Sequence, residues 1–166
     1  MYRLYSGTGM VSDNSGGTRA VAVTASISDT LQRWPGANPV AVTPGQPLPS
    51  DKYMYTLGSW SITVAGLGLF FGSRGNLYIE VLPNEELADT MWTFESEAGG
   101  AYVWMGNVFF DDPSNQNWPK STNPDFAQLP RTLTCMCNNL GPSMTALLAP
   151  GGIGQATGQF TIKRVP

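Results

Sequence analysis

Apolar and polar residues alternate along much of this chain with a period of two. From residue 21 to residue 28 the odd-numbered side chains are apolar, whereas the even-numbered ones are small. Side chains at i and i+2 lie on one face of a strand, so this pattern is typical of a strand with one buried face. No segment has the sustained i, i+3, i+4 apolar spacing of an amphipathic helix, and residues 83–91 are the only candidate for a helical turn. The pattern therefore predicts an all-β chain.

The alternating segments are separated by Gly, Pro, Asn and Ser, and they predict about eight or nine strands. These strands cover residues 19–28, 52–57, 59–71, 76–84, 91–95, 101–110, 131–137, 143–150 and 159–165. Such spacing is typical of a two-sheet antiparallel β-sandwich, jelly-roll-like in plan. We expect a single domain over residues 1–166, either whole or excised from a longer protein. The parity of each strand predicts a core that includes Val21, Val23, Ile27, Ile62, Val64, Leu77, Ile79, Val81, Phe160 and Ile162.

The segment 59–71 changes parity in its middle. Trp60, Ile62 and Val64 share one face, but after Gly66 the large apolar residues occupy positions 67, 69 and 71. One extra residue in a strand reverses the facing of everything that follows, so we predict a β-bulge near Gly66–Gly68. The glycine-containing stretch 72–76 is then expected to be the hairpin loop that leads to the next strand.

Two long segments rich in Pro, Asn and Ser, 34–51 and 111–130, are predicted to be loops, and each contains a tryptophan followed by proline. Long loops on a rigid scaffold are where binding residues concentrate. We therefore expect a binding surface formed by Trp34, Asn38, Asn115, Asn117 and Trp118. The alternative is that each tryptophan pins its own loop to the protein body. The tryptophans within strands, at positions 60, 92 and 104, are expected in the core.

The composition excludes several kinds of catalytic site. The chain has no histidine, which removes Ser-His-Asp and Cys-His catalysis and histidine-based zinc sites. Glu95 and Glu97 share a strand face and leave a glycosidase-type carboxylate pair open, but the sequence around them is typical of a solvated turn. We therefore predict that the protein is not an enzyme. Asp111 and Asp112 offer oxygen ligands for a calcium ion, the one cofactor left open, although Asp-Pro-Ser-Asn is also ordinary turn chemistry.

Charge and cysteine usage bear on partners and on the compartment. Only 13% of residues are charged, and the nine basic ones are scattered, so we predict no nucleic-acid binding. No apolar stretch is long enough to span a bilayer and the first residues lack an apolar core, which predicts no membrane insertion and no signal peptide. Cys135 and Cys137 would lie on one face of a strand with poor geometry for a disulfide, so we expect two reduced thiols in the core. No glycosylation sequon occurs, and together these features favour synthesis in a reducing cytoplasm.

In its low charge, its richness in Gly, Pro, Ala and Thr, its long Asn/Pro loops and its closing segment TGQFTIKRVP, the chain resembles capsid proteins of small icosahedral positive-strand RNA viruses. It is most similar to a protruding domain of noda-like, tetra-like or Lake Sinai-type viruses, because a basic RNA-binding arm is missing. The resemblance implies a surface domain of the virion, made in the host cytoplasm. It would self-associate into a homo-oligomer or capsid, mediate capsomer contacts and attach to a host receptor or glycan. The alternative function is a carbohydrate-binding, lectin-like β-sandwich module.

Overall fold

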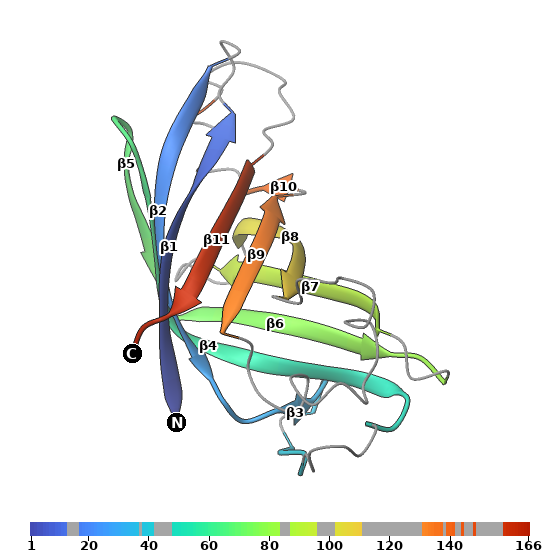
Figure 1. The fold of residues 1–166 in the computed structure, drawn as a ribbon. Coiled ribbons are helices and arrows are strands. Elements are labelled where there is room, and N and C mark those ends of the chain that lie inside the picture. Colours follow the sequence, from blue (N-terminus) through green and yellow to red (C-terminus); the bar gives the residue numbers. More distant parts are fainter. Residues whose placement is uncertain are drawn as a thin grey trace.

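The computed structural model describes residues 1–12, 17–36, 38–41, 48–83, 87–95, 102–110, 131–137, 139–141, 144, 148 and 158–166, and shows an all-β chain (Figure 1). The strands in these residues are β1 (Tyr2–Ser12), β2 (Thr18–Ser28), β3 (Gln32–Arg33), β4 (Asp51–Val64), β5 (Gly68–Gly72), β6 (Arg74–Val81), β7 (Leu87–Glu95), β8 (Tyr102–Phe110), β9 (Thr132–Cys137), β10 (Asn139–Leu140) and β11 (Gly158–Arg164).

The strands form a closed antiparallel barrel rather than a sandwich. Neighbours follow the order β8-β7-β6-β4-β2-β1-β11-β9, and β9 pairs back with β8, which closes an eight-strand barrel. The short strands β3 and β5 pair with β4 outside this circuit, and β10 pairs with β8. The predicted two-sheet β-sandwich is therefore wrong, and a jelly roll describes the fold only loosely.

Two long strands account for the closure, because each belongs to both sides of the barrel. Residues 51–56 of β4 pair with β6, whereas its later residues, from Leu57 to Val64, pair with β2. In the same way β8 pairs first with β7 and then, from Val108 onward, with β9. Strands that pass from one sheet to the other form the corners of such a fold. Figure 1 shows the consequence: β1, β2, β9 and β11 run across the direction of β6 and β7.

The barrel interior is filled by side chains, as alternation predicts. All ten residues of the predicted core are buried, and so are Trp60, Trp92 and Trp104. Phe160 packs against the rings of Trp92, Phe94 and Trp104 at centroid distances of 6.2, 5.8 and 5.1 Å. The indole N–H of Trp60 donates to the carbonyl of Arg74, whereas those of Trp92 and Trp104 are buried and have no acceptor among the described residues. Each such N–H costs about 1–3 kcal/mol. Burying about 150–250 Å² of ring contributes about 4–6 kcal/mol, so burial outweighs that cost.

A hairpin turn, not a bulge, explains the change of parity at Gly66. β4 pairs with β5 and β6 in one continuous register, from Asp51↔Val81 to Val64↔Gly68. The chain reverses at residues 65–67, where the N–H of Leu67 donates to the carbonyl of Val64 at 3.0 Å. Gly66, with a φ of 76°, occupies the third position, which in a type II turn requires positive φ. The predicted bulge and the predicted loop at 72–76 are therefore both wrong.

The sequence pattern also missed or misassigned some elements. The strand β1 was not predicted, because Gly7 and Gly9 occupy inward positions while Tyr2, Leu4 and Met10 are exposed. Residues 87–91 of the suspected helical turn belong to the strand β7. In the predicted strand 143–150, the two described residues, Met144 and Leu148, are buried and have helical backbone.

The two cysteines confirm the prediction made for them. Cys135 and Cys137 are both reduced and buried, and they alternate with outward-facing Met136 on β9. Leu133 lies on the same inward face. The thiols therefore serve as small core side chains.

Candidate functional site

A pocket of about 300 Å³ lies on the outer face of β4, β6 and β7, beneath the chain that follows β3. Its volume is at the lower end of the range for small-molecule sites. The described residues that line it are Trp34, Lys52, Tyr53, Tyr78, Ile79, Glu80, Met91 and Thr93. The register explains why the strand residues meet there: Lys52 is opposite Glu80, Tyr78 is opposite Met91, and all four side chains have outward parity.

Trp34 covers this pocket because β3 is fastened to β4. Gln32 and Arg33 pair with Met54 and Tyr53, and the next backbone N–H, that of Trp34, donates to the carbonyl of Lys52 at 3.0 Å. An ion pair of 3.1 Å between Arg33 Nη1 and Asp51 Oδ2 joins the same two segments. The tryptophan side chain is thereby held over the sheet, although it remains 40% exposed.

The Trp34 ring contacts both an aromatic and a cationic side chain. Its centroid lies 5.9 Å from that of Tyr78, and the two ring planes stand at 86°, an edge-to-face pair. The ammonium of Lys52 lies 5.5 Å from the Trp34 centroid, which is within the range of a cation–π contact. Because two neighbours orient the ring in the structure, a ligand would meet an aromatic wall whose position is already set.

Hydrogen-bonding groups surround the apolar wall. Asn76 Nδ2 donates to the Tyr78 hydroxyl oxygen at 3.1 Å. Burial raises the pKa of the Tyr78 phenol, and the carboxylate of Glu95 raises it further, while hydrogen bonds with Asn76 and Thr93 partly offset both effects. The phenol is therefore protonated at neutral pH. With Lys52 as a donor and Glu80 as an acceptor, the pocket combines an apolar side with polar groups of both kinds.

The structure brings one predicted site residue, Trp34, into this pocket. Asn38 lies in the same loop and its carbonyl accepts the backbone N–H of Arg33 at 3.0 Å, so it closes the loop but does not line the pocket. Asn115, Asn117 and Trp118 lie outside the described residues, as do Asp111 and Asp112 of the predicted calcium site. Glu97 of the carboxylate pair also lies outside them. Among the described residues, no three Cys, Asp or Glu side chains gather as a metal site.

Sequence reasoning missed the strand residues that complete the pocket. Tyr78, Glu80 and Thr93 alternate with buried neighbours and are indistinguishable from a solvated strand face in the sequence. The available signal was an aromatic residue, Tyr78, at an outward strand position. It becomes informative only once β3 is known to bring Trp34 beside it.

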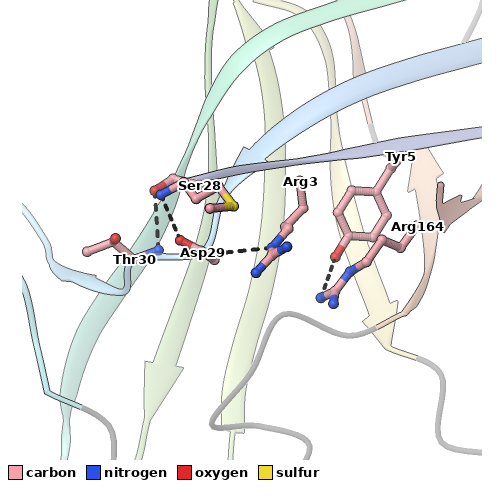
Figure 2. A network of polar contacts seen from close by, with 7 residues as sticks. Arg3, Tyr5, Ser28, Asp29, Thr30 and Arg164 are labelled. Carbon is pink, nitrogen blue, oxygen red and sulfur yellow. Dashed lines mark hydrogen bonds and ion pairs between the residues drawn. The ribbon is translucent and has the colours of Figure 1, made fainter. Parts of the chain in front are cut away.

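A second polar cluster lies at one end of the barrel and joins β1, β2 and β11 (Figure 2). Asp29 forms ion pairs with the Met1 amine at 3.0 Å and with Arg3 Nε at 3.3 Å. The hydrogen bond from that amine holds the pKa of Asp29 below its usual range. Arg164 Nη2 donates to the Tyr5 hydroxyl at 3.4 Å. These ion pairs are exposed and contribute about 0–1 kcal/mol each, so the cluster fastens strand ends and lacks the enclosure of a binding site.

No protein-family model matches this chain, and no curated protein or solved structure is significantly similar to it. Within the described part of the chain, no helix has both the length and the apolar character needed to cross a membrane. Because these comparisons suggest no function, the functional proposal rests on the Trp34 pocket.

Proposed function

We propose that this protein is a binding domain that holds a sugar ring of a glycan in the Trp34 pocket. The observation that carries the proposal is the pocket itself, which joins an exposed tryptophan to polar groups on three strands. The alternative drawn from the sequence, that Trp34 only pins its loop, accounts for its contact with Tyr78. It does not account for the space enclosed beside the ring.

The chemistry of a sugar ring matches the two kinds of surface in the pocket. A pyranose has C–H faces that pack on an aromatic ring and hydroxyl groups at its rim that both donate and accept hydrogen bonds. Trp34 and Met91 supply the apolar contact. Lys52 is a donor and Glu80 is an acceptor, and the hydroxyl of Thr93, which donates to Glu95 Oε1 at 3.5 Å, can act as an acceptor.

The resemblance to viral capsid domains gives this pocket a biological setting. A protruding domain attaches a particle to its host, and a glycan is one of the receptors expected for it. Under this proposal the capsid domain and the carbohydrate-binding module share one activity, which is glycan attachment without catalysis. The capsid interpretation and the location in the virion rest on the resemblance alone.

Glycan-array binding followed by calorimetry on the glycans retained tests the proposal. Trp34→Ala should weaken binding by about 30-fold or more, because an aromatic hot spot contributes about 2 kcal/mol or more. Tyr2→Ala removes an exposed aromatic outside the pocket and is the matched control, with unchanged affinity expected. Absence of glycan binding, or equal affinities of the wild type and a folded Trp34→Ala variant, would refute the proposal.

A further inference from the structure

The strand β5 has an open edge. It pairs with β4 on one side, through Trp60↔Gly72 to Val64↔Gly68, and no other described strand pairs with its opposite side. Figure 1 shows β5 as the outermost strand, separated from β2 by the later half of β4. An antiparallel edge strand leaves alternate N–H and C=O groups without partners, which makes it a template for another strand.

The side chains on this edge are apolar and exposed. Leu69 and Phe71 lie on the outer face of β5 and are 57% and 69% exposed. Natural edge strands are usually protected by lysine, proline or a bulge. None of these is present in β5, and no charged residue occurs anywhere from residue 53 to residue 73. An unprotected edge of this kind marks an interaction surface.

We propose that β5 pairs with β5 of a second copy of this chain, antiparallel across a two-fold axis. Such an edge is self-complementary, because an antiparallel ladder presents the same donors and acceptors when it is turned about that axis. With Phe70 at the axis, Leu69 of one copy lies opposite Phe71 of the other.

Charge favours a second copy over a charged partner. The outer face next to β5 continues through Ser61 and Thr63 of β4 to Ala22 and Thr24 of β2. None of these residues carries a charge that could attract a basic or acidic protein. Leu69 and Phe71 of two copies can therefore meet without removing ions from water, because the nearest charged side chains, Arg19 at the hairpin tip and Arg74 beyond Ser73, lie at the two ends of the edge. Because five residues form a small interface, the dimer is weak and depends on concentration.

Sedimentation equilibrium and amide hydrogen exchange over a range of protein concentrations test this pairing without any glycan. We expect the mean mass to rise towards that of a dimer as concentration increases. We also expect the amides of residues 68–72 to become more protected over the same range. Protection of these amides from exchange indicates backbone hydrogen bonds between strands, which contact through side chains alone would not produce.

Phe71→Lys and Leu69→Lys place a charge on the edge and should each abolish the concentration-dependent association. Thr8→Lys introduces the same charge at an exposed position of the same outer face, on β1, and should leave association unchanged. Near-UV circular dichroism of the buried tryptophans verifies that each variant is folded. A wild type that remains monomeric at all concentrations, protection that does not change in β5, or association that survives Phe71→Lys would each overturn the proposal. None of these outcomes affects the glycan proposal, because the Trp34 pocket lies on β4, β6 and β7.

Discussion

The chemical reactivity of Cys135 is suppressed by its position inside the barrel. Its side chain is 0% exposed, and burial raises the pKa of its thiol well above the usual value. The thiolate is the reactive form of cysteine, so both the protonation and the enclosure of this side chain protect it.

We therefore expect iodoacetamide to modify Cys135 in the folded protein only as fast as the barrel opens and exposes this side chain. In denaturant, two alkylated thiols should appear by mass spectrometry. Peptide mapping after short labelling times distinguishes Cys135 from Cys137. Native-state labelling of Cys135 as fast as that of a small free thiol would contradict this prediction.

Trp34 shows how far a single residue could be interpreted from the sequence. Its loop position and the proline that follows identified Trp34 as a binding candidate, and in the structure Trp34 lines a pocket. Its neighbours could not be identified, because the contact with Tyr78 depends on how β3 pairs with β4. Local alternation shows which face a side chain occupies, but it does not show which distant strand brings a partner to it.

At the scale of the element, the β4–β5 hairpin depends on the backbone conformation of Gly66. A φ of 76° lies in the left-handed region, where residues with a Cβ are strained. A Cβ at this position would also approach Arg19 Nη1 at 3.0 Å, a contact that a flexible side chain can relieve. The backbone strain therefore decides the cost of a substitution.

Gly66→Ala should lower the free energy of unfolding by about 1–2 kcal/mol, measured by urea denaturation. Gly66→Asn should cost less, because asparagine tolerates this conformation. Gly36→Ala serves as the control: Gly36 does not have a left-handed φ, and among the described residues a Cβ there would meet Asn38 alone, at 3.7 Å. Equal stabilities of Gly66→Ala and the wild type would mean that the turn has another conformation.

The same hairpin explains which parts of the fold the sequence could predict. Parity identified the buried face of each predicted strand, and all ten predicted core residues are buried. A parity change at a glycine, however, arises equally from a bulge and from a chain reversal. The sequence alone did not distinguish a bulge from a chain reversal. A bulge would bury Leu69 and Phe71, whereas the reversal leaves both side chains exposed. Barrel closure was not predictable either, because it depends on β4 and β8 each pairing with strands on both sides.

At the scale of the whole molecule, the buried phenols couple folding to alkaline pH. Burial strongly raises the pKa of Tyr55, and burial also raises that of Tyr5 at the same end of the barrel. A raised pKa in the folded state means that the folded protein holds its proton more tightly than the unfolded chain does. The stabilisation is complete below the unfolded-chain pKa of about 10 and is lost as pH rises above it.

We expect the free energy of unfolding to fall above pH 10, by about 1.4 kcal/mol per pH unit for each such phenol. Tyr55→Phe removes one of these phenols and should reduce the slope of unfolding free energy against pH by the contribution of a single phenol. Urea denaturation between pH 9 and about pH 11.5 measures this slope. Tyr2→Phe, at an exposed position, is the matched control and should leave the slope unchanged. A wild-type stability that is flat over this interval would contradict the expectation.

The pairing of β1 with β11 has a consequence for how the chain reaches its native state. Residues 5–11 are paired with residues 158–164, so the barrel cannot close until β11 has been synthesised. A nascent chain therefore leaves the ribosome with the edge of β1 uncovered, and β9 lacks the same neighbour. Folds dominated by such distant pairings acquire their structure slowly, over milliseconds to seconds, and are prone to aggregate meanwhile. We therefore expect chaperone engagement to be greatest just before residues 158–164 emerge, and to end once they are in place.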